Sequence, residues 1–395
     1  MNTEIENFQL IESSEQLKKF VSENKSVDWM SFDTEFVGER RFHTTICLIQ
    51  AATSKGSFIV DPLAVEDISP FFELLENRDI VKITHAGDND YRLFYQQYNV
   101  LPRNVVDTQI TAAFVGYKYP VSFRKLVESE LNITLNKGFT VADWETRPLQ
   151  KKHLKYALYD VLYLHDLWKF LFKKLDKLGR VDWVLEECAQ LETADFYEID
   201  PDRETLESPI IKGLHLKEQV FLLRFYRWRR EEAKRLNLSK EMVLQGKMLN
   251  MILRTIPGGF EALSHNRRIP ENITKKYGQL FDQMFDLPPT TEEKRLLQNI
   301  PADKTENPRQ DILTEMLDLI IKFKCLDHQI AHEIVMPRGI LKRMKTDCDY
   351  FDPLLENGWR GEFLGKELTN WLHNRTKIDL NFQDEALVIK LLNDE

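Results

Sequence analysis

The chain has few cysteines and no long apolar run. Its four cysteines, Cys47, Cys188, Cys325 and Cys348, lie far apart and form no Cys-x-x-Cys pair. That spacing argues against a disulfide framework and against a zinc site, and it indicates a reducing compartment such as the cytoplasm. No eighteen-residue stretch is free of charge, so no transmembrane helix and no membrane partner are expected. The acidic first ten residues lack the apolar run of a signal peptide.

The composition is that of a folded protein with two or three domains. The 395 residues are 43% hydrophobic and 30% charged, with 15 glycines and 15 prolines, which excludes disordered and collagen-like chains. The net charge is −9, yet residues 211–280 hold fifteen Lys and Arg against six Asp and Glu. A basic block in an acidic chain fits a phosphate-binding surface as well as it fits a solvated helical surface.

The first part of the chain, residues 1–175, alternates strand and helix patterns. Runs rich in bulky and β-branched residues at 26–37, 44–53 and 56–63 predict an antiparallel meander. Strand-helix units follow, and they end in one long predicted helix at 149–178. This order predicts an α/β domain with a mixed sheet flanked by helices.

The rest of the chain has a different pattern. Residues 176–210 carry eleven acidic and three basic residues and are predicted to form an acidic linker. Beyond it the apolar spacing is helical throughout, which predicts two all-α domains, a basic one at 211–290 and an acidic one at 300–380. Three self-contained domains leave no obvious apolar stripe exposed, so we expect a monomer without an obligate protein partner.

Two carboxylates stand two residues apart within the first predicted strand. Residues two apart on a strand point to the same face, so Asp33 and Glu35 should lie side by side. Their apolar neighbours place them at the edge of a core, where close carboxylates repel unless a cation neutralises them. Oxygen ligands suit Mg²⁺ or Mn²⁺, although a pair of acids on a strand is often only a solvated edge.

Further acids and a tyrosine follow at the starts of helices or within them. Asp88 and Asp90 come where a strand gives way to a helix, and so does Asp107, for which helix capping is the default interpretation. Tyr156 and Asp160 are four residues apart on a helix and therefore share a face. Each of these signals is weak by itself, since acids at such positions most often cap helices and such tyrosines more often pack in a core.

The order of these signals is more specific than any one of them. The stretches FDTEF, ICLIQAA, HAGDNDYRLF, VVDTQITAAFVGY and YALYDVLYLHDL resemble those of ribonuclease D, in the tyrosine subgroup of the DEDD exonuclease superfamily. The similarity extends over the helical part, where residues 211–290 and, more loosely, 300–380 look like two HRDC domains. The resemblance implies a ribonuclease H-like exonuclease domain at 1–175.

The resemblance also implies roles for individual residues. Asp33, Glu35, Asp90 and Asp160 would hold two divalent metal ions, Mg²⁺ or Mn²⁺, and Tyr156 would orient the attacking water. Asp90 is preferred to Asp88 because it stands five residues after His85. The implied reaction is two-metal hydrolysis of phosphodiester bonds from the 3′ end, with release of 5′-mononucleotides.

The implied substrate is structured RNA, with tRNA precursors carrying 3′ trailers as the family's usual partner. Arg229, Arg230, Lys234 and Arg235 of the basic helical part are the residues expected to contact RNA phosphates. A 3′-5′ DNA exonuclease and a non-catalytic RNA-binding adaptor are the alternatives. The retained acids argue against the adaptor. No GxxxxGK[ST] loop is found, so the chain is not itself a helicase.

Overall fold

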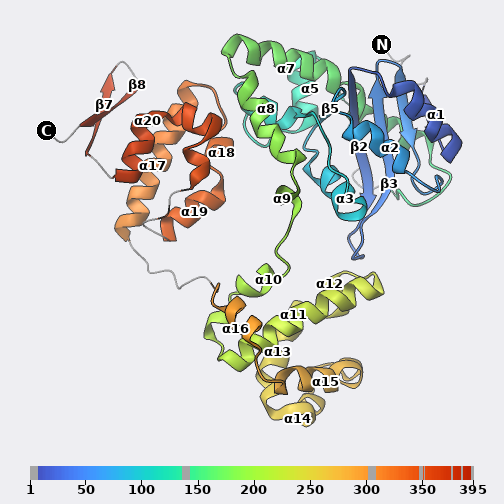
Figure 1. Ribbon diagram of the computed structural model, residues 1–395, viewed down its shortest axis with the longest axis vertical. Helices are drawn as coiled ribbons and strands as arrows, with labels where there is room; N and C mark the ends of the chain where they lie inside the picture. Colours follow the sequence, from blue (N-terminus) through green and yellow to red (C-terminus); the bar gives the residue numbers. More distant parts are fainter. Residues whose placement is uncertain are drawn as a thin grey trace. The chain divides into compact units, whose positions relative to one another are not determined.

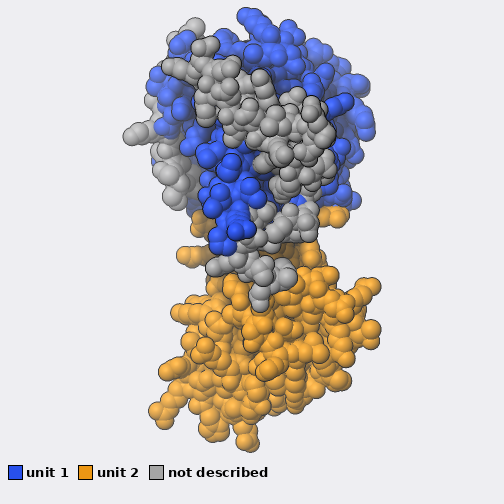
Figure 2. Space-filling view, turned by 90° about the vertical axis from the view of Figure 1, so that its left-hand side faces the viewer, with its two compact units in different colours: residues 1–36, 46–197, 305–395 blue, residues 37–45, 198–304 orange. Residues whose placement is uncertain are grey.

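The computed structural model describes residues 8–135, 143–300, 308–346, 350, 352–374, 377–383 and 386–392. The chain forms two compact units (Figures 1 and 2). Unit 1 joins residues 1–36, 46–197 and 305–395, and unit 2 consists of residues 37–45 and 198–304. Described helical residues between 317 and 368 therefore share a core with residues 113–188, which adjacency in the sequence did not predict.

A mixed six-stranded sheet forms the centre of unit 1, as the sequence predicted. Its strand order is β1-β4-β3-β2-β5-β6. β1 pairs with β4 in parallel, β3 and β4 are antiparallel, and β5 is parallel to both β2 and β6. The strands are β1 (Phe8–Ile11), β2 (Trp29–Val37), β3 (Thr45–Thr53), β4 (Gly56–Val60), β5 (Val81–Thr84) and β6 (Val105–Asp107). The edge strand β1 is one element that our sequence analysis did not identify.

Helices cover both faces of this sheet. One face packs on a core that includes Phe20, Phe32, Phe71 and Phe94, from β2 and the helices of the first hundred residues. On the other face, Ala52 and Ile83 pack against Val161 and Leu164. The helices are α1 (Ser14–Asn24), α2 (Ser69–Glu76), α3 (Asp88–Tyr98), α4 (Thr108–Ala113), α5 (Phe123–Leu131), α6 (Lys151–Leu162) and α7 (Leu164–Leu178).

The single long helix predicted at 149–178 is two helices, α6 and α7. The carbonyl of Val161 accepts a hydrogen bond from the Ser31 hydroxyl, 2.9 Å away, and another from the Tyr163 amide. These bonds satisfy a carbonyl at the end of α6 from outside the regular helical ladder. The break at Tyr163 thus lies where β2 contacts the helix.

The predicted acidic linker is largely folded, so that prediction was wrong for its first half. Helix α8 (Val181–Ala189) buries Val184 and Cys188 completely, in one core with the C-terminal helices. The division between units falls after Tyr197 instead. Acidic composition was misleading because the carboxylates of α8 have partners far along the chain.

The C-terminal part of unit 1 is helical and ends in a β-hairpin. Its elements are α17 (Pro308–Asp327), α18 (His332–Val335), α19 (Arg338–Thr346), α20 (Gly358–Asn374), β7 (Lys377–Gln383) and β8 (Ala386–Leu392). The Glu187 carboxylate of α8 receives two hydrogen bonds from the Arg360 guanidinium, at 2.7 and 2.8 Å, and one from the Trp359 indole at 2.8 Å. A buried ion pair therefore fastens α20 to α8. The sequence did not predict the hairpin.

Unit 2 is helical, as predicted, around an aromatic core that includes Phe221, Phe225 and Phe281. Its longer helices are α11 (Leu216–Leu236), α13 (Gly246–Thr255), α14 (Gly259–His265), α15 (Glu271–Asp286) and α16 (Thr291–Leu297). Short helices α10 (Arg203–Leu206) and α12 (Lys240–Val243) flank α11.

Two expectations about composition can be compared with the structure. Cys47, Cys188 and Cys325 are buried and carry free thiols, and Cys348 lies outside the described residues. Among the described helices, none has the length and apolar character needed to span a bilayer.

Candidate active site

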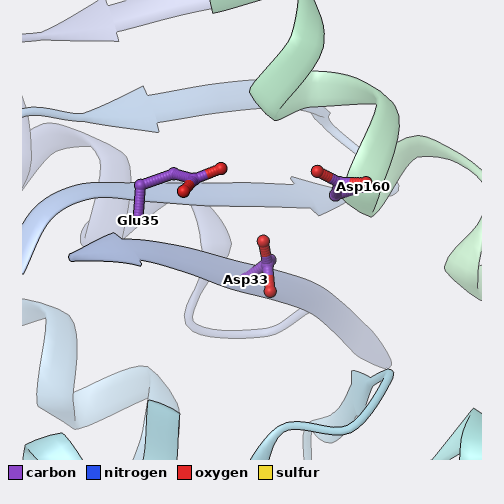
Figure 3. Close-up of side chains that lie close together, drawn as sticks. All are labelled: Asp33, Glu35 and Asp160. Atoms are coloured by element: carbon purple, nitrogen blue, oxygen red, sulfur yellow. The ribbon is translucent and has the colours of Figure 1, made fainter. Parts of the chain in front are cut away.

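Three carboxylates meet where β2 passes beneath α6. Asp33 and Glu35 point from the same face of β2, as the two-residue period of a strand requires. Asp160 reaches them from α6, and Figure 3 shows the three side chains gathered around one space. One oxygen of each carboxylate lies within 4.8 Å of one oxygen of each of the others. Residues far apart in the sequence thus form one acidic cluster.

Polar contacts on both sides of α6 hold it over the sheet. The Ser31 hydroxyl donates to the Val161 carbonyl at the end of the helix. Before its start, the Arg147 guanidinium makes two hydrogen bonds to the buried Asp61 carboxylate, at 2.6 and 2.8 Å, and one to the Cys47 carbonyl at 2.9 Å. The position of Asp160 is therefore fixed by contacts to β2, β3 and the end of β4.

Asp90 joins the cluster from the first turn of α3. Its carboxylate is buried and accepts a hydrogen bond from the hydroxyl of Thr34, the residue between the two acids of β2. Its negative charge raises the pKa of Asp33. Asp88 is only about half buried, and its pKa is raised by burial and by Asp107. The structure thus brings Asp90, not Asp88, to the cluster.

Asp107 acts as the helix cap that the sequence predicted. One of its oxygens accepts the amides of Gln109 and Ile110 at the start of α4, at 2.8 and 3.2 Å. The other accepts the Gly87 amide at 2.9 Å, immediately before α3 begins. A Cβ at Gly87 would lie 2.6 Å from the Thr84 hydroxyl oxygen, so only glycine fits this approach. These contacts fix the start of the helix that carries Asp90.

Burial and mutual repulsion make the acids of the cluster weak. Burial is the main cause at each of them. It raises the pKa of Glu35 to about 8, with contributions from Asp160 and Asp90, and raises the pKa of both Asp90 and Asp160 to about 7. At Asp33, burial together with three neighbouring acids raises the pKa well above the usual value. Such a cluster is costly to ionise without positive charge.

Tyr156 lies beside these acids, one helical turn before Asp160. Burial, followed by the charges of Asp160, Glu35 and Asp33, raises the pKa of its hydroxyl to about 12. The ring of Trp144 stacks near it, with centroids 6.4 Å apart. At neutral pH the hydroxyl therefore keeps its proton and is a hydrogen-bond donor.

The donor set of this cluster fits hard divalent cations. Carboxylate oxygens are the preferred ligands of Mg²⁺ and Mn²⁺, and a bound cation would offset the repulsion that raises these pKa values. Within the described residues, no other group of acids, histidines or cysteines has this spacing. The residues present thus agree with a divalent metal site.

Comparison with known proteins shows similarity to exonucleases. A family profile described as 3′-5′ exonuclease matches residues 8–176. Ribonuclease D of Bartonella henselae is 28% identical over 372 residues, which cover 93% of this chain and 90% of that protein. Ribonuclease D of Gluconacetobacter diazotrophicus is 29% identical over 365 residues, 91% of each chain. The chain is thus similar to ribonucleases D over most of its length.

The fold of this chain is also similar to that of a solved ribonuclease D. The crystal structure of Escherichia coli RNase D, titled an exoribonuclease involved in structured RNA processing, matches with a TM-score of 0.79 at 25% identity. The match covers 93% of this chain and 98% of that one. The catalytic core of RRP6 from Trypanosoma brucei shares the fold over 71% of this chain, with a TM-score of 0.56 at 21% identity. The exonuclease domain and the helical part therefore both have structural counterparts.

The four basic residues expected to contact RNA have different environments on α11. Arg229 is 4% exposed, and its guanidinium bonds to the Glu241 carboxylate and to the Lys240 carbonyl. Arg230 is partly buried and donates to the Pro201 carbonyl. Arg235 is exposed but pairs with Glu232 through two 2.7 Å hydrogen bonds. Lys234 is exposed.

The burial and ion pairing of Arg229 argue against the phosphate contact expected there, whereas contact at Arg230, Lys234 and Arg235 stays a prediction. Counting charges along a helix does not reveal which of them face acids from neighbouring helices. Arg229 is a structural residue that holds α11 to α12.

Proposed function

We propose that this protein is a metal-dependent 3′-5′ exoribonuclease that hydrolyses phosphodiester bonds and releases 5′-mononucleotides. The observation that carries the proposal is the cluster of Asp33, Glu35 and Asp160, with the buried Asp90 beside it, in a domain that matches 3′-5′ exonucleases. The names of the relatives, ribonuclease D, support RNA as the substrate.

In this proposal Asp33, Glu35, Asp90 and Asp160 hold two divalent ions, Mg²⁺ or Mn²⁺. Such ions supply charge stabilisation for the attacking and leaving oxygens of an in-line displacement. Four carboxylates carry four negative charges when ionised, which equals the charge of two divalent cations. The chain's own contribution is to fix the four acids, through β2, α3 and α6, before substrate arrives.

Tyr156 is assigned to orienting the attacking water. Its hydroxyl, with a pKa raised to about 12 by burial and by the neighbouring acids, holds its proton at neutral pH. A protonated hydroxyl can hold a water oxygen as a donor but is a poor base. Its role is therefore positioning of the water rather than removal of its proton.

The proposed substrates are structured RNAs, and tRNA precursors with 3′ trailers are the first to test. Unit 2, proposed to be an HRDC-like domain, would bind the body of the RNA through exposed cations. Lys234 and Arg235 of α11 remain candidates for phosphate contact, and Arg230 is a weaker one because it is partly buried.

A second basic surface of unit 2 carries more exposed charge. Lys247 and Arg254 are seven residues apart on the exposed face of α13, about two helical turns along one line. The Asn266 side chain donates to the Thr255 hydroxyl at 2.8 Å, which holds the adjacent Arg267 and Arg268 beside the end of α13. Between 246 and 270 these four cations are accompanied by one carboxylate, Glu261. We propose that this surface also contacts the RNA backbone.

Digestion of a 5′-labelled RNA with a single-stranded 3′ tail tests the proposed activity. The reaction would be run with Mg²⁺, with Mn²⁺ and with chelator, beside Asp33→Asn and a DNA strand of the same sequence. We expect a metal-dependent ladder that shortens from the 3′ end, is absent in Asp33→Asn and forms faster on RNA. Equal or faster cleavage of DNA would identify a DNA exonuclease instead. No cleavage by folded protein with either metal would identify a binding adaptor.

A further inference from the structure

One buried side chain near the acids has no hydrogen-bond partner among the described residues. Gln50 of β3 is fully buried, and neither its amide nitrogen nor its amide oxygen is bonded within that part of the chain. Burying an amide without hydrogen-bond partners is unfavourable, because the group loses its hydrogen bonds to water and gains none in the protein. Such a group in a folded core calls for an explanation, and a ligand or ion site beside it is one.

The sheet places Gln50 on the face that carries the acids. Ala52, two residues along β3, packs against Val161 of α6, so Gln50 also lies on the α6 side. β2 is the neighbouring strand, and the Ser31 hydroxyl lies 3.4 Å from the Ala52 carbonyl oxygen and bonds to the Val161 carbonyl of α6.

This register brings Gln50 next to the first acid of the cluster. Ser31, Asp33 and Glu35 alternate along β2 on the α6 side, and Ser31 lies beside Ala52. β2 and β3 are joined by the short connection 38–44 and run in opposite directions. Two residues after Ser31 on β2 comes Asp33, and two residues before Ala52 on β3 comes Gln50. Asp33 and Gln50 are therefore neighbours across the two strands. The opposite face of β3 is accounted for, since Ile49 and Ala51 belong to the other core.

We propose that Gln50 is a positioning residue for the carboxylate cluster. Its side-chain amide donates hydrogen bonds to the acids once the site holds divalent cations. The amide offers two N–H donors, and an ionised carboxylate accepts hydrogen bonds only. A donor from β3 would fix which oxygens of the acid turn toward the cation. This inference rests on the proposed function, because it needs the cluster to bind metal.

Metal affinity and stability of a Gln50 variant distinguish a positioning role from a purely structural one. Gln50→Met keeps the length and bulk of the side chain but removes the amide. If Gln50 only filled space, the variant would bind metal like the wild type. If Gln50 positions the acids, metal affinity falls while the metal-free fold is as stable as before, or more so, since an unpaired amide has gone.

The test is titration of the chelator-treated full chain with Mn²⁺, followed by calorimetry and by the electron paramagnetic resonance signal of free Mn²⁺. We expect the Kd for Mn²⁺ to rise ~10–100-fold in Gln50→Met, the range found for residues that orient metal ligands, with an unchanged or higher melting temperature in chelator. The control is Thr53→Val, which removes another buried polar group of β3 whose hydroxyl donates to Asn24, 2.6 Å away. It should leave the Kd for Mn²⁺ at the wild-type value.

The outcomes separate this inference from the function on which it rests. Wild-type affinity in Gln50→Met would overturn the role of Gln50 and leave the metal site intact. Absence of Mn²⁺ binding by the wild type itself would overturn the proposed metal site, and the inference with it. Should Gln50→Met fail to fold, Gln50→Asn keeps the amide but shortens its reach, and it should also weaken Mn²⁺ binding.

Discussion

Thr34 donates a hydrogen bond from its hydroxyl to the carboxylate of Asp90. The donor stands between Asp33 and Glu35 on β2, and the acceptor lies in the first turn of α3. Two of the elements that bear acids are thus tied by one side chain, which the sequence analysis did not single out. A substitution that removes the Thr34 hydroxyl should therefore change the orientation of the Asp90 carboxylate.

Thr34→Val should lower activity more than stability. Valine keeps the shape of threonine on the strand but cannot hold the Asp90 carboxylate, whose orientation then becomes variable. We expect the rate constant of the cleavage step on a 3′-tailed RNA to fall roughly 10-fold, because a small misplacement of a catalytic group is costly. Single-turnover cleavage at saturating Mg²⁺ measures this, and Thr53→Val serves as the matched control. Equal rates in the two variants would contradict the assignment.

Metal-induced stabilisation should grow with pH. The acids of the cluster have higher pKa values when folded than when unfolded, so the metal-free folded state binds more protons, and its stability falls as pH rises from about 4 through 7–8. Cations compete with those protons. Thermal unfolding with and without Mg²⁺ should therefore show a larger difference at pH 8 than at pH 6. A difference independent of pH would argue against these acids as the ligands.

Arg360→Met should destabilise the chain strongly. It removes the cation paired with Glu187 and leaves a carboxylate in the interface between α8 and α20, which typically costs about 3–5 kcal/mol. Urea unfolding followed by tryptophan fluorescence would measure the decrease in stability. Lys19→Met breaks the exposed pair with Glu23 and should change stability by less than about 1 kcal/mol. Similar small effects in both variants would contradict the role of the buried pair.

RNA binding can distinguish the exposed cations around α13 from the buried Arg229 of α11. Alanine at Lys247, Arg254, Arg267 and Arg268 should weaken affinity and flatten its dependence on salt, because each phosphate left without its cation lowers the slope by about one. Alanine at Arg229 should instead lower the stability of unit 2, because that guanidinium is buried against Glu241. Unchanged binding in the four-residue variant at low salt would remove this surface from the proposal.

Local sequence patterns were enough to predict much of the fold and part of the candidate site. The two-residue period of a strand placed Asp33 and Glu35 on one face, and the capping role of Asp107 followed from its position between strand and helix. Asp160 could be associated with them only through the family resemblance. No local rule brings a helix at residue 160 over a strand at residue 33.

What the sequence did not reveal depends on contacts between distant segments. The acidic stretch around Glu187 looked like a linker because its partner, Arg360, lies 173 residues away. Arg229 looked like a surface cation because the acids that neutralise it come from other helices. Gln50 stands in an apolar run, and only the three-dimensional arrangement shows that its amide is unpaired.

The discontinuity of unit 1 bears on how the chain folds during synthesis. Residues 198–304 separate the N-terminal domain from the helices that cover α8. At ~5–20 residues per second, the ribosome needs roughly 5–20 s to make that stretch. Throughout this interval Trp183 and Glu187 of α8 lack their contacts with Trp359 and Arg360 of α20. The interface between α8 and α20 can therefore form only after unit 2 has been synthesised.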